Sequence, residues 1–442
     1  MTQETHLWAA PGGLSTRLVI LFTAVFLTWF ATAPAWPHEP HEQGDQQQWG
    51  HWRGPLGNGA SPTAIPPTRF DPATNCQWQQ PIPGCGSSSP VVWTNQVFVT
   101  TAVPQEDGSG SMAFQLLCYE RSTGNLLWTR TATTARPHEG THSTNGYASA
   151  SPCTDGQFVY AHFGSRGTFC FTMDGTLVWE RDFGDMQTRN EFGEGSSPTL
   201  FADRLIIPWD HEGPSRLICV DARTGQTIWD TPRDEPTCWA TPLVVSIPDG
   251  GHQIVMNGQT AARSYDFGTG TERWRCPGQT QRPVASPVAA NGLVYIGSGF
   301  RGSFLGCFDL TGHGDLAETQ HVRWTVSRDT PDIASPLLHD GRLWYYKEKS
   351  GLLTCLDAAT GQPHYERERI PGISRTYASP VAAGGHIYLT DRSGAITVIK
   401  DGPDLSIVAT NDMGEGVDAS PAPVGQQLFI RGDRHLFCFG QK

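Results

Sequence analysis

The stretch Ala285-Ser286-Pro287-Val288-Ala289-Ala290-Asn291-Gly292-Leu293-Val294-Tyr295-Ile296 decides the fold, because its first three residues recur along the chain. The element Ala/Ser-Ser/Thr-Pro occurs eight times, and its prolines are Pro90, Pro152, Pro198, Pro242, Pro287, Pro336, Pro380 and Pro421. Their spacings are 62, 46, 44, 45, 49, 44 and 41 residues. Repeats of this length are typical of propellers with four-stranded blades and are longer than those of leucine-rich or helix-pair solenoids.

Each repeat contains the material for four strands. The proline precedes two apolar runs joined by a Gly, Asp or Asn turn, which predicts a β-hairpin. A third run carries a cysteine at a fixed phase in six repeats, at Cys118, Cys170, Cys219, Cys307, Cys355 and Cys438. A fourth run follows an acidic residue and a Thr-Gly or Asp-Gly turn, in which Gly supplies a positive φ. We expect the aromatic residue after this turn to pack between sheets, at Trp128, Trp179, Trp229, Trp274 and Trp324.

The missing strand of the last repeat lies at the other end of the chain. The eighth repeat ends at Phe439 after three strands, whereas Trp78 stands twelve residues before Pro90. Trp229, Trp274 and Trp324 stand 13, 13 and 12 residues before the next proline. We therefore expect the segment from Cys76 to complete the eighth blade. The sequence predicts an all-β, eight-bladed β-propeller of four-stranded antiparallel blades over residues 76–442.

The N-terminal residues predict export. A thirteen-residue apolar run, Leu18 to Phe30, precedes small residues up to Ala35, which favours a secretory signal peptide in residues 1–35. An uncleaved N-terminal anchor is the alternative, although the run is short for a bilayer span. Residues 36–75 carry Trp49, Trp52 and many Pro and Gly residues, so we expect an irregular extension laid over the ring. The chain is expected in the periplasm or outside the cell.

The charge of the chain limits the classes of partner that it is expected to bind. The formal net charge is −12, from 31 basic and 43 acidic residues without a Lys/Arg run, which argues against nucleic acid and anionic membrane surfaces. We expect a monomer.

Cysteines at the repeated strand position are expected to pack as small core residues. Of the eleven cysteines, Cys76 and Cys85 are the first candidates for a disulfide, with Cys153, Cys238 and Cys276 less suited.

The repeat resembles that of the PQQ-binding-like β-propeller family, named after pyrroloquinoline quinone. The resemblance rests on Ser-Pro, a hairpin and Asp-x-x-Thr-Gly-x-x-x-Trp over residues 76–442. Longer motifs, Trp49 to Pro55 and Gly414 to Pro421 among them, resemble exported members of that family. Its quinoprotein dehydrogenase branch implies PQQ and calcium at the centre of the ring with an Asp base. Its other branch, the outer-membrane assembly factor BamB, implies a non-enzymatic scaffold.

Several parts that the resemblance requires are absent from the sequence. There is no adjacent Cys-Cys pair, which the dehydrogenases use as a platform for the quinone, and no Cys-x-x-Cys-His for a haem. The lipid-bearing cysteine of the assembly factor is also missing. We therefore predict an exported non-enzymatic scaffold or binding protein that presents its channel-mouth loops to a protein, peptide or glycan. The alternative is a PQQ-dependent oxidoreductase acting on an alcohol or sugar.

Candidate site residues precede the Ser-Pro elements, where the innermost strands begin. Carboxylate and amide oxygens there could bind a hard cation such as calcium, and the candidate ligands are Asn145, Glu194, Asp332 and Asp418. Asp332 and Asp418 are also the candidate general bases. Aromatic and basic residues could hold a planar or sugar-like cofactor or ligand, and the candidates are Tyr147, Trp239, Arg375 and Tyr377. The alternative is that these side chains only fill and hydrate the channel.

The stretch from His138 to His142 has the spacing His-Glu-x-x-His. Zinc hydrolases need this spacing on a helix, so that both imidazoles share one face. Pro137, Gly140 and Thr141 argue for a loop instead. We expect a loop-stabilising role at the rim of the channel.

Overall fold

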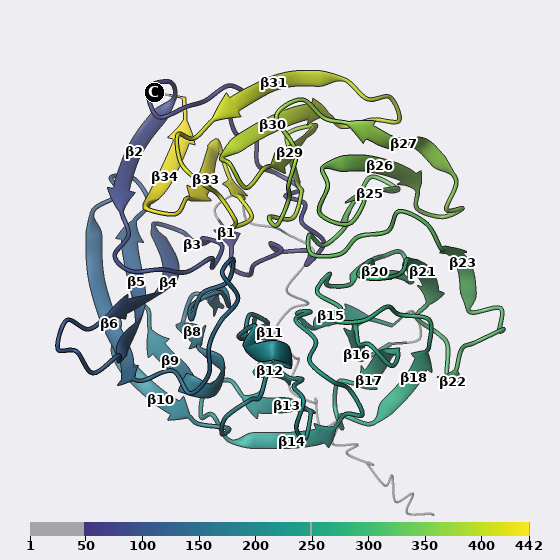
Figure 1. The fold of residues 1–442 in the computed structure, drawn as a ribbon, viewed down its shortest axis with the longest axis horizontal. Coiled ribbons are helices and arrows are strands. Elements are labelled where there is room, and N and C mark those ends of the chain that lie inside the picture. Colours follow the sequence, from purple (N-terminus) through teal and green to yellow (C-terminus); the bar gives the residue numbers. More distant parts are fainter. Residues whose placement is uncertain (1–47, 248–249, 442) are drawn as a thin grey trace, which may run out of the picture. The chain divides into compact units, whose positions relative to one another are not determined.

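Residues 48–247 and 250–441, which the computed structural model describes, contain eight sheets arranged as a ring, each with four antiparallel strands (Figure 1). The predicted all-β, eight-bladed propeller is confirmed. The described helices are two 3-10 turns, η1 (Gly164–Arg166) and η2 (Arg189–Glu191). Neither these nor any other described segment forms a helix long and apolar enough to span a bilayer. The predicted signal peptide lies outside the described residues.

Each blade has four strands, in chain order from the axis outward in the first seven blades, whereas the outer strand of the eighth is the N-terminal β2. The inner strands are β3 (Val91–Trp93), β7 (Cys153–Thr154), β11 (Thr199–Phe201), β15 (Leu243–Ser246), β19 (Val288–Ala290), β24 (Leu337–His339), β28 (Val381–Ala383) and β32 (Ala422–Val424). The second strands are β4 (Gln96–Pro104), β8 (Phe158–His162), β12 (Arg204–Trp209), β16 (His252–Met256), β20 (Leu293–Ser298), β25 (Arg342–Tyr346), β29 (His386–Thr390) and β33 (Gln427–Arg431).

The third strands, six of which bear a cysteine, and the outer strands complete the blades. The third strands are β5 (Met112–Glu120), β9 (Thr168–Thr172), β13 (Arg216–Asp221), β17 (Ala262–Asp266), β21 (Phe304–Asp309), β26 (Leu352–Asp357), β30 (Ala395–Lys400) and β34 (His435–Gly440). The outer strands are β6 (Leu126–Ala135), β10 (Leu177–Arg181), β14 (Thr227–Pro232), β18 (Glu272–Cys276), β23 (Val322–Val326), β27 (Pro363–Arg369), β31 (Ile407–Asp412) and β2 (Cys76–Pro81). Two short additions pair with the first and fourth blades, β1 (Gln48–Trp49) and β22 (Gly314–Asp315).

The ring is closed by the N-terminal strand, as the sequence predicts. Strand β2 pairs antiparallel with β34, and Trp78 lies opposite Cys438. Figure 1 shows the purple β2 beside the yellow β34 at the outer edge of the eighth blade. The two ends of the propeller sequence are thus joined by backbone hydrogen bonds of the same kind as those within every other blade.

Most tryptophans of the outer strands dock onto the following blade, namely Trp78, Trp128, Trp179, Trp229 and Trp324. The indole N–H of Trp274 instead donates to Gln253 of its own blade. The indole N–H of Trp179 donates to the carbonyl oxygen of Ala222 at 2.8 Å, and that of Trp78 donates to Arg121 at 2.8 Å. The turn glycine is required for this contact: Gly225 has φ +69°, and a Cβ there would lie 2.8 Å from the Trp179 ring. The Asp-x-x-Thr-Gly pattern therefore encodes a joint between blades as well as a turn.

A closed circle of hydrogen bonds, here called the hydroxyl ring, joins the eight Ser-Pro elements. In each blade, the backbone N–H of the Ser or Thr before the proline donates to the hydroxyl of its counterpart in the next blade, at 2.8–3.1 Å. The members are Ser89, Ser151, Ser197, Thr241, Ser286, Ser335, Ser379 and Ser420, whose N–H returns to Ser89. All eight residues are buried, so each hydroxyl satisfies an N–H that would otherwise lack an acceptor.

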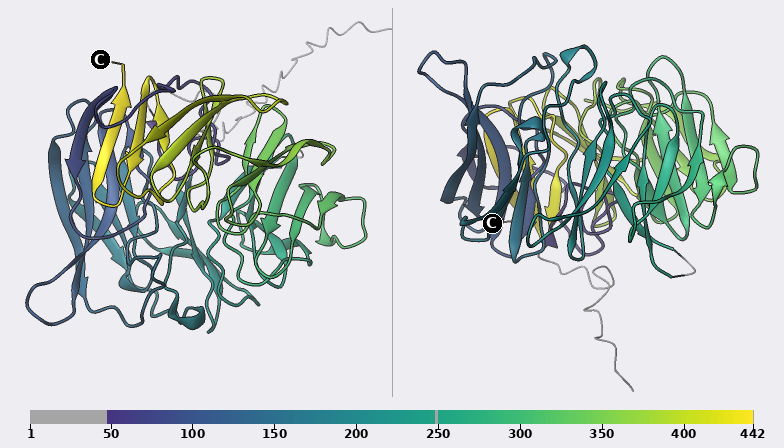
Figure 2. Two further views of the ribbon diagram at one scale, coloured as in Figure 1. Left: turned by 45° about the horizontal axis from the view of Figure 1, so that its top comes forward. Right: turned by 90° about the horizontal axis from the view of Figure 1, so that it is seen from below.

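The described part of the N-terminal extension, residues 48–75, crosses the ring before β2 begins. Arg53 is buried, and its guanidinium donates to the carbonyl oxygens of Pro336 and Pro380 at 2.8 and 3.1 Å. Burial lowers the pKa of Arg53 to about 9. Ala60 forms a parallel bridge with Ala382 of β28. Figure 2 (right) shows the purple extension at the bottom, opposite the loops that project from the upper face.

All eleven cysteines are free thiols, so Cys76 and Cys85 are not joined to each other. The six cysteines of the third strands are buried, as the sequence predicts. Burial raises the pKa of Cys118 to about 12, as it does for Cys170 and Cys219. These thiols behave as small core residues.

Candidate functional site

The upper end of the central channel opens into a cavity of about 380 Å³, here called the mouth basin. Its floor includes Trp52 of the extension, whose indole N–H donates to Ser420 of the hydroxyl ring at 3.4 Å. Above the hydroxyl ring, aromatic side chains from four blades line the basin, namely Phe192, Trp239, Phe300 and Tyr377. The basin therefore combines a hydroxyl-lined base with an aromatic wall.

Trp239 and Tyr377, two of the predicted ligand-binding aromatics, line the mouth basin. Trp239 is held in place because its indole N–H donates to Gly193 at 2.7 Å. Tyr147 instead lines a neighbouring cavity, and its hydroxyl donates to the backbone oxygen of Glu139 at 3.1 Å. Arg375, the basic member of the predicted ligand-binding set, is exposed, with its guanidinium 5.8 Å from the ring of Tyr377.

The two predicted general bases are each paired with an arginine. Asp332 accepts a hydrogen bond from Arg282 at 3.2 Å, and the Arg282 guanidinium lies 3.5 Å from the Phe300 ring centroid. Asp418 accepts two bonds from Arg392, at 2.6 and 2.8 Å. Burial raises the pKa of Asp332, and the charge of Arg282 opposes that shift. The mouth therefore presents neutralised ion pairs.

The predicted calcium ligands do not converge. Glu194, Asp332 and Asp418 do not form a group whose ligand atoms lie within 4.8 Å of one another. Asn145 is used in the loop: its side-chain oxygen accepts from Ser149 at 2.6 Å and its nitrogen donates to Phe192 at 2.9 Å. The physical reason is that the three carboxylates precede the inner strands of three non-adjacent blades, β11, β24 and β32, and two of them pair locally with an arginine.

PQQ and calcium do not fit these residues. Calcium takes about six to eight oxygen ligands, but the guanidinium groups of Arg282 and Arg392 occupy the carboxylates that would supply them. Free cysteines throughout residues 76–438 also leave no disulfide platform for a quinone. The geometry supports a binding cavity without the dehydrogenase cofactor set.

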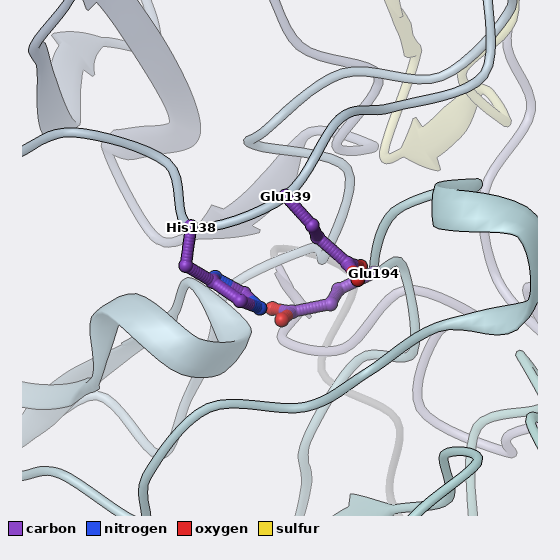
Figure 3. A group of neighbouring side chains, drawn as sticks. All are labelled: His138, Glu139 and Glu194. Carbon is purple, nitrogen blue, oxygen red and sulfur yellow. The ribbon is translucent and has the colours of Figure 1, made fainter.

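A second cavity, the side pocket, lies next to the mouth basin and shares Trp239 and Ser149 with it. Its lining includes His138, Glu139 and Glu194, whose ligand atoms lie within 4.8 Å of one another (Figure 3). Desolvation raises the pKa of the Glu194 carboxyl to about 7, although hydrogen bonds from Ser165 act in the opposite direction.

The His-Glu-x-x-His stretch adopts the loop conformation that the sequence predicts. Residues 136–150 contain no helix, and the two histidines diverge. His142 hydrogen-bonds Thr144 at 2.8 Å and packs edge-on against Phe192 at 4.9 Å. His138 faces the side pocket instead. The geometry of a zinc hydrolase is absent from this loop.

These observations define an eight-bladed propeller with one aromatic, arginine-rich channel mouth. The family model described as outer membrane protein assembly factor BamB matches residues 70–232 and 173–402. The chain therefore belongs to this family of PQQ-like β-propeller proteins. No curated protein matches the chain in sequence.

Solved structures share the fold at low identity. BamB from Moraxella catarrhalis is 12% identical with a TM-score of 0.56, covering 83% of this chain and 99% of its own. A europium-containing methanol dehydrogenase is 9% identical with a TM-score of 0.63, covering 90% and 98%. Quinohemoprotein alcohol dehydrogenase from Comamonas testosteroni is 11% identical with a TM-score of 0.62, covering 90% and 82%. Similarity at this level concerns the fold alone.

The sequence analysis missed the basic and apolar members of the mouth. Phe300, Lys349 and Arg392 come from loops that do not lead into a Ser-Pro element. Arg282 stands three residues before Ala285, the place that Arg375 holds before Ala378, and this position is the signal that could have found it. The recurrence of Ser or Thr before the proline is likewise a signal of a shared acceptor.

Proposed function

We propose that this chain is an exported, non-enzymatic binding protein whose mouth basin receives a protruding part of a protein, peptide or glycan partner. The observation that carries the proposal is the basin itself, with Trp52 on its floor and an aromatic wall above the hydroxyl ring. Its volume of about 380 Å³ falls within the roughly 300–1,000 Å³ of ligand cavities.

The chemistry of the walls favours recognition over catalysis. Aromatic faces such as Trp239 and Tyr377 bind apolar side chains and sugar rings, and the ion pairs of Asp332 and Asp418 offer hydrogen bonds with little net charge. Asp332 and Asp418 are occupied by arginines, so neither serves as a free base. Because interblade hydrogen bonds fix the base of the cavity, a ligand would meet a preorganised surface.

Thermal-shift screening of defined peptide and oligosaccharide libraries tests this function. A ligand of the basin should raise the melting temperature of the wild type but not that of Tyr377→Ala or Trp239→Ala. Leu177→Ala, at an exposed position of outer strand β10, is the matched control and should respond like the wild type.

Two outcomes would contradict the proposal. One is a ligand response that persists unchanged in both mouth variants. The other is a melting-temperature rise with added PQQ and calcium accompanied by dye reduction in the presence of an alcohol or sugar, which would establish the oxidoreductase.

A further inference from the structure

Three potential metal ligands from two separate segments meet in the side pocket. His138 and Glu139 lie in the loop between β6 and β7, and Glu194 lies between η2 and β11. Their ligand atoms all lie within 4.8 Å of one another. Figure 3 shows the imidazole of His138 directed at the carboxylate of Glu194, with the side chain of Glu139 extending down toward the side chain of Glu194.

Hydrogen bonds hold both carboxylates in this orientation. Glu194 accepts from the backbone N–H of Ser165 at 2.8 Å and also from the Ser165 hydroxyl. Glu139 accepts from the backbone N–H of Thr188 at 3.0 Å and also from the Thr188 hydroxyl. Each carboxylate has about four lone-pair sites, so these bonds orient the groups without exhausting them.

The charge balance here differs from that of the other carboxylates around the mouth. Asp332 and Asp418 each form an ion pair with an arginine, and the buried Asp210 does so with Arg233. Glu139 and Glu194, in contrast, form no ion pair with a Lys or Arg of the described residues. Two carboxylates at this separation repel each other unless a proton or a cation lies between them.

We propose that His138, Glu139 and Glu194 bind one divalent transition-metal ion, Zn²⁺ or Mn²⁺. An imidazole nitrogen beside two carboxylate oxygens suits these ions, whereas calcium and magnesium prefer oxygen ligands alone. Three protein ligands leave a coordination position free for water or a ligand atom. The side pocket provides that space, with a volume of about 50 Å³.

Both ring nitrogens of His138 have polar neighbours. Its Nε2 lies 2.6 Å from the carbonyl oxygen of Met186, so metal binding at Nε2 would replace one hydrogen bond. Its Nδ1 lies 3.4 Å from the guanidinium of Arg166, which also forms an ion pair with Asp185. These contacts fix the imidazole beside the carboxylates, and the metal would compete with Met186 for Nε2.

The site differs from the zinc-hydrolase pattern in its sequence. Only the first two residues of the His-Glu-x-x-His stretch take part, and the third ligand comes from a segment more than fifty residues away. His142, the second histidine of the pattern, is engaged with Thr144 and Phe192. His142 is therefore a natural control on the same loop.

Isothermal titration of the mature chain, after dialysis against a chelator, tests the proposal. We expect one Zn²⁺ or Mn²⁺ per chain, with calcium binding much more weakly. Glu194→Gln and His138→Gln should each weaken binding more than about a hundredfold, since outer-sphere partners alone cost about 10–100-fold. His142→Gln and Asp332→Asn should leave the affinity unchanged.

A spectroscopic arm makes the test independent of variant folding. Wild-type protein loaded with Mn²⁺ should show electron spin echo modulation from one imidazole nitrogen, absent in His138→Gln. Failure of the wild type to bind either ion at millimolar concentration would overturn the proposal. Binding that survives Glu194→Gln, or that is lost equally in His142→Gln, would overturn it as well.

Discussion

The hydroxyl ring and the mouth basin lie on successive levels of the same channel, yet they are built in opposite ways. In the ring, eight blades contribute the same group to the same hydrogen bond, from Ser89 around to Ser420. In the mouth, each blade contributes something different: an indole from Trp239, an ion pair from Arg282 and Asp332, a phenol from Tyr377.

The difference separates architecture from function. Residues that repeat hold the blades together, and residues that break the repeat create the chemistry of the cavity. One propeller fold can carry unrelated functions, and this fold is shared with both BamB and an alcohol dehydrogenase.

Removal of an interblade tryptophan is expected to have the largest effect on stability. Trp78→Ala and Trp179→Ala should each lower the free energy of unfolding by about 3–5 kcal/mol, as expected for a large aromatic lost from a core. Both indoles donate to a carbonyl of the next blade at 2.8 Å, so the two losses should be similar. Chemical denaturation measures both losses. A negligible loss for Trp78→Ala would show that the contact closing the propeller contributes less to stability than the contacts between other blades.

Acidification is expected to have the next largest effect, through His162 at the side pocket. Burial lowers the pKa of His162 to about 4, from an ordinary value near 6.5. Between these two pH values His162 is protonated in the unfolded chain but neutral in the folded protein, so the free energy of unfolding falls as the pH drops through this window. At about 1.4 kcal/mol per pKa unit, protonation of His162 lowers the free energy of unfolding by about 3 kcal/mol across this window.

Denaturation midpoints of the wild type and His162→Gln between neutral pH and pH 4 measure the contribution of His162. The variant should lose less stability on acidification than the wild type. Parallel pH profiles for the two proteins would contradict the assignment to His162.

A single change in the hydroxyl ring should have a smaller effect. Ser335→Ala leaves the buried N–H of Ser286 without an acceptor and should cost about 1–3 kcal/mol. Ser335→Thr should be tolerated, because Thr241 performs the same role in the fourth blade. Equal stability of the Ala variant and the wild type, measured by chemical denaturation, would contradict a structural role for the ring.

The same contrast explains how much the sequence could predict. The Ser-Pro period, the tryptophan turn and the position of Trp78 predicted the blades and their closure, because these features obey local rules that recur. The carboxylates of Asp332 and Asp418 were predicted as cation ligands, but each meets an arginine from another loop, 50 and 26 residues earlier in the chain.

Contacts between loops of this kind depend on three-dimensional placement that no single-sequence spacing reveals. His138 illustrates the same limit. Its motif predicted a loop, and only the fold shows that this loop brings the imidazole to Glu194.

Site-specific photo-crosslinking tests most directly the claim that the unrepeated mouth residues bind the partner. A benzophenone side chain would be placed at Tyr377 in the mouth and, in a separate protein, at exposed Ile407 of outer strand β31. The account predicts one defined peptide or glycan adduct at Tyr377, competed by the ligand found in the thermal screen, and none at Ile407. An adduct at Ile407 alone, or equal labelling at both positions, would contradict it.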